Sequence, residues 1–304
     1  MERINYLIDE TEEGGRLDKI LSEKSEDFSR ARIQQLLDQG LILVNDEIKK
    51  NNYKVKRGDE ITIDIPEVKE LEAFPQDLNL DILYEDEDII VVNKPKGMVV
   101  HPGAGNPDHT LVNGLLFHCK DLSGINGVLR PGIVHRIDKD TTGCIVACKN
   151  DKAHEAISKQ LSNKTCSRDY IAIVHGELPH EYGTIDAPIG RDSKDRQKMT
   201  VTDKNGRDAV THFKVEERFK GFTLVSFKLE TGRTHQIRVH MQYIGYPIVG
   251  DPKYAFRNTR TDTEGQVLHA EALTLVHPTT NETMTFKAPL PDYFKALIEE
   301  MRGY

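Results

Sequence analysis

The sequence predicts an α+β protein in two parts: a small N-terminal α/β module, and a larger domain whose mixed, largely antiparallel sheet carries a cleft. The chain has 304 residues, about twice the length of a common single domain. In its larger part the strand-like segments outnumber the helical ones and do not alternate with them. An acidic segment without a clear apolar period, residues 67–80, lies between the two parts and is predicted to be a linker.

Residues 1–66 form the predicted module. Apolar residues at helical spacing predict two helices, in GGRLDKILSEKS and in RARIQQLLDQ. Ser29 precedes the second helix as its N-cap, and Gly40 follows it, where a left-handed residue commonly ends a helix. Short strands are predicted in LILVNDEI and in EITIDI, which alternates strictly. Two helices and a small sheet make a complete unit at the lower end of domain size.

Residues 81–304 form the predicted larger domain. Its expected strands are the segments DIIVVNK, GIVHRID, GCIVACK, YIAIVHG, VTHFKVEERF, FTLVSFKLETG, LHAEALTLVH and ETMTFKA. Helices are expected over residues 109–120, 151–162, 234–244 and 292–302. Because helices do not separate successive strands, this order favours a mixed or antiparallel sheet over a doubly wound parallel one.

Basic charge is concentrated in two segments of an otherwise acidic chain. The net charge is −8, which by itself argues against a nucleic-acid partner. Residues 191–260, however, hold 15 basic and 8 acidic side chains, and residues 130–170 hold 8 and 5. Binding responds to the local field within a Debye length, about 8–10 Å. Nucleic acid therefore stays a candidate partner, with a solvated basic face as the alternative.

The composition argues against several classes of protein. No run of 18 apolar residues occurs, and the acidic start lacks the apolar core of a secretory signal. The four cysteines are too few for a disulfide framework, so we expect a cytoplasmic protein without a membrane partner. On a strand, Cys144 and Cys148 would lie about 13 Å apart, too far for one zinc ion. The histidines lack metal-binding spacing, so we predict no metal site.

The segment GVLRPGIVHRIDKDTTG is the first candidate functional motif. A predicted strand places Arg136 and Asp138 on one face, with His135 beside them, just before a turn. A surface turn with a solvated carboxylate is the alternative interpretation. Asp138 and Asp140 also raise the possibility of a glycosidase pair, but the neighbouring cations would lower both pKa values, which does not suit a general acid.

The segment LETGRTHQIRVHM is the second candidate motif. A strand ends at Gly232, and Arg233, His235 and Arg238 then crowd the start of a helix. Arg233 and Arg238 could both bind a phosphate or a carboxylate, because the guanidinium group offers a planar fork of donors. The helix dipole disfavours cations at this end, so their presence favours a bound anion.

Three segments in this order, HRIDKDTTG, SRDYIAIVHG and TGRTHQIRVHM, resemble the RluA-type family of RNA pseudouridine synthases. The flanking VVHPGAGNPDHTLVNGLL and GYPIVGDPKY are similar to its large-subunit ribosomal RNA synthase D branch. RLDKIL, FSRARIQQLLDQGLILVN and YKVKRGDEI resemble an S4 RNA-binding domain. The resemblance implies isomerisation of uridine to pseudouridine without a cofactor, in RNA and most directly in 23S ribosomal RNA. Transfer RNA as substrate, or a catalytically silent ribosome-assembly factor, remains an alternative.

The resemblance also implies roles for individual residues. Asp138 corresponds to the nucleophile, and Arg136 to the residue that fills the gap left by a flipped-out uridine. Tyr170 corresponds to the aromatic residue under the flipped base. Arg238 corresponds to the partner of the nucleophile, with Arg233 as the competing assignment. Attack at C6 of the base and attack at C1′ of the sugar both stay open.

Further positions are expected to contact RNA. These candidates are His135, Arg233, Arg30, Arg32 and Lys54. The basic segment RDSKDRQKMTVTDKNGR is predicted to be a flexible loop that grips phosphates, which gives affinity rather than sequence choice. We expect the protein to act as a monomer.

Overall fold

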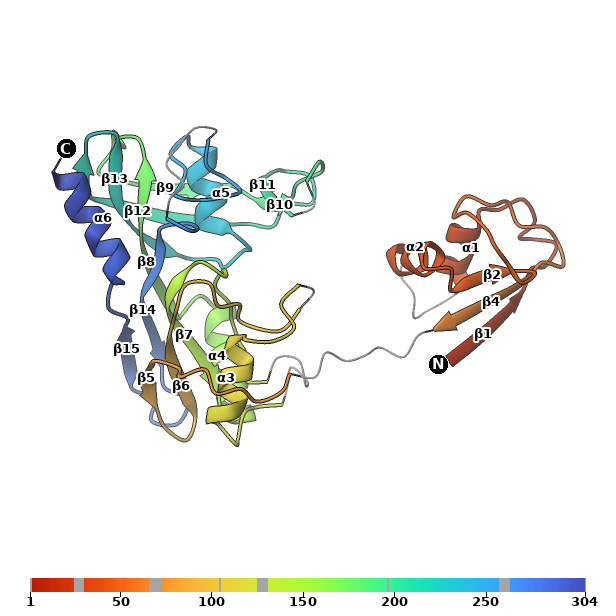
Figure 1. The fold of residues 1–304 in the computed structure, drawn as a ribbon, viewed down its shortest axis with the longest axis horizontal. Coiled ribbons are helices and arrows are strands. Elements are labelled where there is room, and N and C mark those ends of the chain that lie inside the picture. Colours follow the sequence, from red (N-terminus) through yellow and green to blue (C-terminus); the bar gives the residue numbers. More distant parts are fainter. Residues whose placement is uncertain are drawn as a thin grey trace. The chain divides into compact units, whose positions relative to one another are not determined.

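The computed structural model describes residues 2–24, 30–65, 73–103, 105–124, 131–195, 197–256 and 263–303. The chain divides into two compact units, Met1–Glu70 and Leu71–Tyr304 (Figure 1). Each unit has its own sheet and its own apolar core. The α+β class and the largely antiparallel sheets that the sequence predicts are confirmed.

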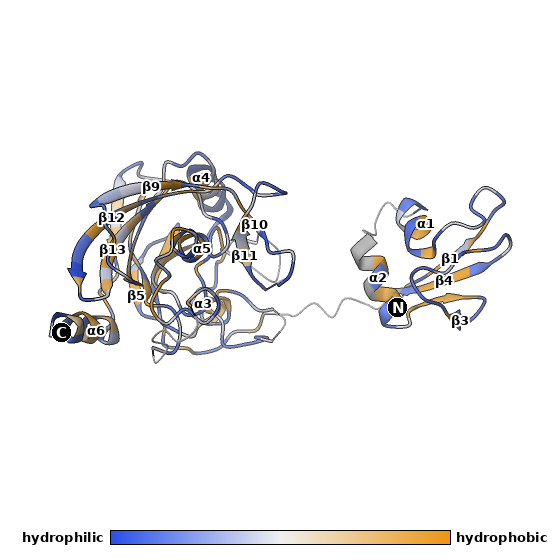
Figure 2. Cartoon of the chain, turned by 90° about the horizontal axis from the view of Figure 1, so that it is seen from above, coloured by the Kyte–Doolittle hydropathy of each residue, from blue (hydrophilic) through white to orange (hydrophobic). Residues whose placement is uncertain are grey.

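Four strands and two helices make up the first unit. They are β1 (Glu2–Leu7), α1 (Leu17–Lys24), α2 (Arg30–Asp38), β2 (Ile42–Val44), β3 (Glu47–Ile48) and β4 (Glu60–Ile65). The sheet is antiparallel, with the strand order β1-β4-β2-β3. Leu21 of α1, Leu36 of α2 and Ile63 of β4 lie together in its core. Hydrophobic residues accordingly line the facing sides of the helices and strands in Figure 2.

Most elements of the first unit follow the sequence prediction. Gly40 follows α2 in the left-handed region with φ +70°, as expected of a residue that ends a helix. The predicted N-cap, Ser29, lies outside the described residues. Strand β1 was not predicted, although its residues alternate between exposed and half-buried as a sheet strand should.

The second unit is built on a nine-stranded sheet. Its strands are β5 (Ile82–Glu85), β6 (Ile89–Lys94), β7 (Thr142–Cys148), β8 (Ser167–His175), β9 (Tyr182–Asp186), β12 (Val210–Phe219), β13 (Phe222–Leu229), β14 (Leu268–Val276) and β15 (Thr283–Lys287). The order is β5-β6-β7-β14-β8-β13-β12-β9, with β15 on β14. Among the described pairs, β7 and β14 run parallel and the others antiparallel.

In the described residues of this unit, four helices and a two-stranded sheet accompany the large sheet. They are α3 (Leu111–His118), α4 (Asp151–Ser162), α5 (Gln236–Tyr243), α6 (Asp292–Arg302), β10 (Ile189–Arg191) and β11 (Met199–Val201). Strands β9, β12 and β13 curve around α5 (Figure 2). In the part of the chain that the structure describes, no helix combines the length and the apolar character needed to cross a membrane.

Central strands are apolar on both faces because helices cover both sides. In β6, Ile90 joins the core under α3, whereas Val91 joins the core under α4. In β8, Ala172 packs in the core of α5, whereas Ile173 packs against α6. Such two-sided burial explains why these segments read as continuous apolar runs in the sequence.

Two sequence predictions about this unit are wrong. The strand expected over GIVHRID is absent: after a single bridge from Ile133 to Ala147, residues 134–138 pair with no strand. Strand β14 pairs with β7 at Thr142 and Gly143, and just beyond the Ile133 bridge the Val146 N–H of β7 donates to the His135 ring instead of to a backbone carbonyl. The basic segment expected as a flexible loop, residues 191–207, contains β11 and the last residue of β10, which pair with each other.

Gly143 is required where β7 meets β14. Its φ is +108°, and a Cβ atom there would collide with the backbone carbonyl of Ala270 on the parallel neighbour. We expect Gly143→Ala to lower the free energy of unfolding of this unit by about 3 kcal/mol, from backbone strain plus steric overlap. Urea unfolding followed by circular dichroism would measure the change.

Gly221→Ala is the matched control for this prediction. Gly221 also has a positive φ, +78°, but a Cβ atom there would meet nothing within 4 Å. We expect a cost of about 1 kcal/mol from the backbone alone. Equal losses in the two variants would show that the contact with β14 does not matter.

Candidate active site

Asp138 lies in the unpaired segment between the Ile133 bridge and β7. Its neighbour Ile137 is buried in the core beneath α5, which anchors the segment. The Thr141 N–H donates to the Asp138 carbonyl at 3.1 Å and closes a turn. The Asp138 side chain keeps 18% of its surface exposed, so a substrate can reach the carboxylate.

Arg238, one turn into α5, holds this carboxylate. Its Nη1 donates to Asp138 Oδ2 at 2.7 Å. Its Nε and Nη2 donate to the two oxygens of Asp251 at 2.7 and 2.9 Å, a bidentate pair. Burial alone would lower the pKa of Arg238, but its hydrogen bonds to Asp251 and the Asp138 charge outweigh burial and raise it. Arg238 therefore stays cationic between two carboxylates.

Gln236 shapes the turn that leads from β13 into α5. Its Oε1 accepts from the Thr231 hydroxyl at 2.8 Å and from the Arg233 N–H at 2.9 Å. Its Nε2 donates to the Val210 carbonyl at 3.0 Å. This buried clamp fixes the backbone that presents Arg233 and His235 beside Asp138.

Three adjoining pockets of about 50, 300 and 420 Å³ open around Asp138. All three are lined by Arg136, Asp138 and His235. Together they make one cleft with the Asp138 carboxylate at its centre. A nucleotide-sized ligand fits a cleft of this total size.

Tyr170 of β8 borders two of these pockets from the core side. The ring is buried, with 7% of the residue exposed. Burial raises the pKa of its hydroxyl to about 12, so the side chain is a neutral aromatic surface at physiological pH. Such a surface can stack against a planar base.

The other predicted residues of this unit lie around the same cleft but differ in exposure and in their hydrogen-bond partners. Arg136 is exposed, and His235 approaches Asp138 with its Nε2 at 3.9 Å from Oδ1. Arg233 donates through Nε to the Asp208 carbonyl at 2.9 Å, so the ion partner of Asp138 is Arg238. His135 Nε2 accepts from the Val146 N–H at 3.1 Å; burial lowers the pKa of this ring to about 3, so it stays neutral.

The remaining predicted RNA contacts, Lys54, Arg30 and Arg32, belong to the first unit. Lys54 is exposed, and its backbone forms an isolated β-bridge with the backbone of Arg16. The side chains of Arg30 and Arg32 lie outside the described residues, although their backbone belongs to α2.

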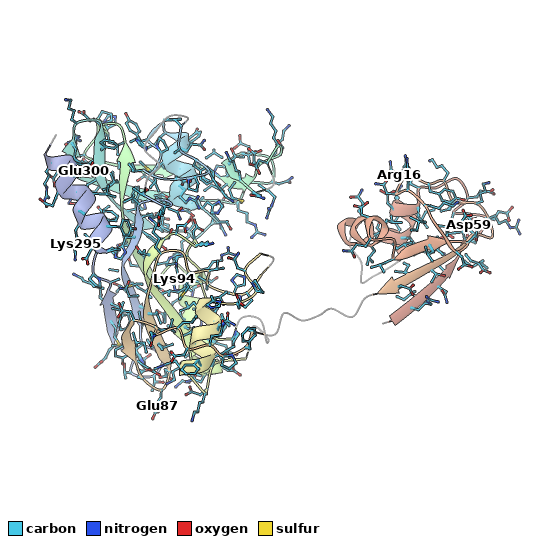
Figure 3. The ribbon with its side chains drawn as sticks, viewed as in Figure 1. Arg16, Asp59, Glu87, Lys94, Lys295 and Glu300 are labelled. Atoms are coloured by element: carbon cyan, nitrogen blue, oxygen red, sulfur yellow. The ribbon has the colours of Figure 1, made fainter. Side chains whose placement is uncertain are left out.

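Lys94 is a functional candidate that the sequence analysis missed. The side chain is fully buried at the end of β6 (Figure 3). Its Nζ donates to three backbone carbonyls, of Pro95, Met98 and Lys139, at 2.8, 2.8 and 2.9 Å. The last of these directly follows Asp138, so Lys94 fixes the backbone of the candidate nucleophile. A lysine in sequence normally indicates a solvated surface, which is why no local signal identified it.

Replacing Lys94 by Met should lower the free energy of unfolding by about 3 kcal/mol, because three buried carbonyls lose their donor. Burial lowers the pKa of Lys94 to about 7 from 10.5, while the Asp140 and Asp138 charges act in the opposite direction. Between these two pKa values the unfolded chain binds more protons than the folded one. The stability difference between wild type and variant should therefore widen from pH 7 to pH 9 in urea titrations.

Lys139→Met is the control for this prediction. Lys139 is an exposed lysine on the same segment, and its replacement should change stability by less than about 0.5 kcal/mol at either pH. A constant difference between wild type and Lys94→Met across this pH range would contradict the lowered pKa.

Asp251 and Tyr254 were also missed, although both lie in the segment GDPKY. Asp251 has no exposed side-chain surface, and its Oδ1 accepts from the Lys253 and Tyr254 N–H groups at 2.9 and 3.0 Å. Its partner Arg238 is 13 residues away in sequence. Local pattern gives no indication of such a pair.

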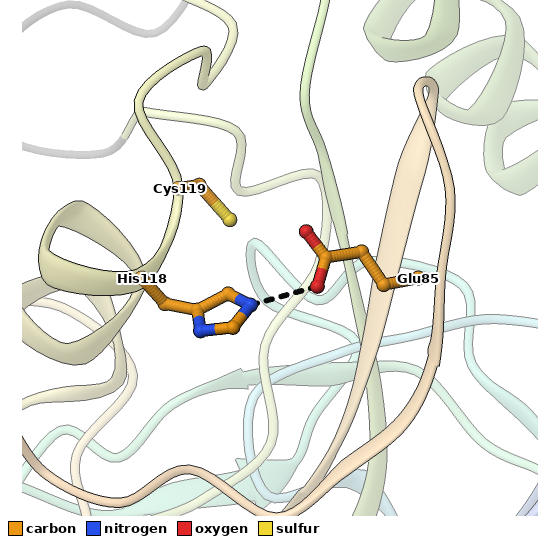
Figure 4. A group of neighbouring side chains, drawn as sticks. All are labelled: Glu85, His118 and Cys119. Atoms are coloured by element: carbon orange, nitrogen blue, oxygen red, sulfur yellow. Dashed lines mark hydrogen bonds and ion pairs between the residues drawn. The ribbon is translucent and has the colours of Figure 1, made fainter.

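A second group of polar side chains lies away from the cleft (Figure 4). Donor atoms of Glu85, His118 and Cys119 lie within 4.8 Å of one another. His118 Nε2 lies 2.7 Å from Glu85 Oε2, and the Lys149 ammonium lies 2.9 Å from Glu85 Oε1. Burial raises the pKa of the Cys119 thiol to about 11. A metal ion here would have to displace the Lys149 ammonium and the proton of the Cys119 thiol. We therefore interpret the group as a cluster in which His118 and Lys149 already pair with the Glu85 carboxylate.

Two family models match the chain. A model described as RNA pseudouridylate synthase matches residues 88–243, which include Asp138, Tyr170 and Arg238. A model of the S4 domain matches residues 15–61, within the first unit. Both matches agree with the resemblance that the sequence motifs indicate, which is thereby confirmed.

Individual proteins give the same result. The chain is 55% identical to an uncharacterized RNA pseudouridine synthase, YlyB, of Bacillus subtilis, over 99% of each chain. It is 44% identical to the ribosomal large subunit pseudouridine synthase D of Zymomonas mobilis, over 94% of this chain and 93% of that protein. Among solved structures, human RNA pseudouridylate synthase domain containing 1 is similar in fold, with a TM-score of 0.58 and 24% identity. That match covers 79% of this chain and 98% of the human one.

Proposed function

The chain belongs to the RNA pseudouridine synthase family, and from this premise we propose that it isomerises a uridine of large-subunit ribosomal RNA with Asp138 as its nucleophile. Family membership makes it an RNA pseudouridine synthase. The roles of the side chains and the choice of RNA are the proposal. The Asp138–Arg238 ion pair at the meeting point of three pockets supports it most directly.

The reaction breaks the N1–C1′ bond of uridine and forms a C1′–C5 bond. C5 loses its proton to solvent and N1 gains one, so atoms balance and nothing is oxidised or reduced. The step needs an ionised carboxylate that can attack and later leave. Arg238 Nη1 donates to Asp138 Oδ2 at 2.7 Å and holds the carboxylate in one orientation. Attack at C6 and attack at C1′ require the same carboxylate.

Arg136 is proposed to fill the gap that the flipped-out uridine leaves. It is exposed beside Asp138 and lines all three pockets. Extruding a base costs a few kcal/mol, which a guanidinium in the vacated position can offset by stacking and phosphate contacts. Tyr170 then offers its ring to the extruded base, a contact typically worth about 1–3 kcal/mol.

Arg136→Ala should therefore lower the single-turnover rate by about 100-fold or more, since a few kcal/mol of stabilisation is lost at the flipped state. Its dissociation constant for RNA should rise by less than about tenfold, because one phosphate contact at most is removed. Filter binding and rapid-quench assays separate the two. A large loss of affinity with an unchanged rate would refute the proposed role.

Large-subunit ribosomal RNA is the proposed substrate because relatives of 41–44% identity carry the name ribosomal large subunit pseudouridine synthase D. The S4-domain match in the first unit supports an RNA partner, with Lys54, Arg30 and Arg32 as proposed phosphate contacts. One copy of the chain supplies the nucleophile, its ion partner Arg238 and the Tyr170 ring, so we propose a monomer as the active form.

Tritium release tests this proposal. RNA labelled at C5 of uridine loses tritium when C5 is joined to C1′. We expect release from 23S RNA or large subunits and none from transfer RNA. Pseudouridine mapping in a deletion strain should show one or a few missing sites in 23S RNA. Release from transfer RNA alone would overturn the choice of substrate, and normal maps with no release in vitro would favour a silent assembly factor.

A further inference from the structure

His235 has an unusual backbone conformation beside the candidate nucleophile. It is the N-cap of α5 with φ 57° and ψ 22°, a left-handed geometry that is costly for a residue with a Cβ atom. Its side chain is 15% exposed, and its Nε2 lies 3.9 Å from Asp138 Oδ1. Such geometry persists only where surrounding contacts hold it. The reaction described above gives His235 no role.

Those contacts form a chain of hydrogen bonds that starts at β11. The Met199 N–H donates to the Tyr254 hydroxyl at 2.9 Å. The same hydroxyl lies 2.8 Å from His235 Nδ1, and the two rings meet edge to face at 5.6 Å. The Asp192 N–H donates to the Lys198 carbonyl, so Asp192 and Lys198 are joined by a hydrogen bond next to the paired strands. In an antiparallel pair the next residue, Met199, then directs its N–H away from β10. The backbone of β11 therefore presents this donor to Tyr254.

Hydrogen-bond accounting assigns the proton on His235. The Tyr254 hydroxyl accepts from the Met199 N–H, and its one proton needs an acceptor; among the described hydrogen bonds, His235 Nδ1 is the acceptor within its reach. Burial raises the pKa of Tyr254 to about 12 and lowers that of His235, so both groups are neutral at physiological pH. With Nδ1 accepting, the ring proton lies on Nε2, the nitrogen that faces Asp138 Oδ1.

Tyr254 also contacts the partner on the other side of the nucleophile. Its N–H donates to Asp251 Oδ1 at 3.0 Å, and its ring lies 5.1 Å from the Arg238 guanidinium. Arg238 in turn donates to Asp138 Oδ2. One buried tyrosine thus touches both groups that flank the Asp138 carboxylate, Arg238 at Oδ2 and His235 at Oδ1.

We propose that Tyr254 and His235 are positioning residues for Asp138: the backbone of β11 orients Tyr254, which fixes the His235 ring with its Nε2–H toward the carboxylate. The inference rests on the proposed role of Asp138. It extends that role by linking the nucleophile to the hairpin of β10 and β11, whose exposed cations lie in the most basic part of the chain.

Tyr254→Phe is the direct test, because it keeps the ring and removes the hydroxyl. We expect the single-turnover rate to fall by about 10- to 100-fold, as when a reacting group is slightly misplaced. The dissociation constant for RNA should change by less than about twofold, since no phosphate contact is lost. Tyr243→Phe is the matched control: it removes the hydroxyl of a residue of α5 that is 61% exposed, and it should leave both values unchanged.

Met199→Pro should lower the rate as Tyr254→Phe does, because proline lacks the N–H that donates to the Tyr254 hydroxyl. His235→Asn keeps a residue that tolerates the left-handed conformation and removes the ring. The double variant Tyr254→Phe/His235→Asn should be no slower than the slower single variant, because both break the same chain. If the rate of the double variant fell by the product of the two single-variant losses, the inference would be overturned.

Histidine ring ¹⁵N chemical shifts give a readout that needs no turnover. In the free wild-type protein we expect His235 to carry its proton on Nε2, and Tyr254→Phe to shift the ring toward a mixture of tautomers. If Asp138→Asn proved active, the proposed function would fail while this tautomer result could stand. If Asp138→Asn were inactive and Tyr254→Phe fully active, or if the proton lay on Nδ1, the positioning role would be refuted.

Discussion

Asp138→Asn should abolish pseudouridine formation, with a loss of at least about 1,000-fold in the single-turnover rate. An amide cannot attack as an ionised carboxylate does, and removal of a nucleophile is among the largest single-residue effects in enzymes. The fold should survive, because the amide oxygen can still accept from Arg238 Nη1, and Arg238 keeps its bidentate pair with Asp251. Tritium release from 23S RNA measures the rate, and filter binding should show unchanged affinity for RNA.

Asp140→Asn is the matched control, since it neutralises a carboxylate two residues away in the same cleft wall. A mechanism with one nucleophile predicts activity within a few-fold of wild type for this variant. Comparable losses in both variants would instead support a paired-carboxylate mechanism. Full activity of Asp138→Asn would exclude Asp138 as the nucleophile.

Arg238→Met should destabilise the second unit by about 3–5 kcal/mol and also abolish activity. Asp251 has no exposed surface, so losing its partner leaves a buried charge without compensation. Asp138 loses the donor that orients it in the same step. Urea unfolding would measure the stability, and tritium release at a temperature where the variant is folded would measure the activity.

The double variant Arg238→Met/Asp251→Asn separates these two effects. Removing the buried charge together with its partner should restore most of the lost stability, because the cost arises from the unpaired ion. Activity should stay lost, since Asp138 still lacks its partner. Recovery of activity together with stability would show that Arg238 contributes to the fold alone.

The sequence predicted what depends on local pattern. Helix α4 begins and ends at the predicted residues, 151 and 162, because an amphipathic period and an Asn150 cap define it. The sequence motifs around Asp138 and Arg238 were recognised because they, too, are local patterns. The pairing of these two residues spans 100 positions, and the sequence left Arg233 as a competing assignment to Arg238. Only the turn held by Gln236 directs one arginine inward and the other to a backbone carbonyl.

Burial and tertiary pairing account for what sequence could not predict. Lys94 and Asp251 are charged residues with fully buried side chains, and a charged residue in sequence indicates surface unless its partners are known. The segment before Asp138 has the alternation of a strand, yet the neighbouring Val146 N–H of β7 donates to the His135 ring, and residues 134–138 pair with no strand. Whether such a segment joins a sheet depends on tertiary contacts, which no local window of sequence contains.

The position of β14 has a consequence for synthesis of the protein. This strand, residues 268–276, lies between β7 and β8, which come about 100 or more residues earlier in the chain. During translation the two halves of the sheet must wait unjoined until β14 has left the ribosome, because long-range pairing is slow and leaves strand edges open. The first unit, with its own core, can fold long before that moment. We therefore expect nascent chains arrested before residue 268 to bind chaperones and to lack any modifying activity.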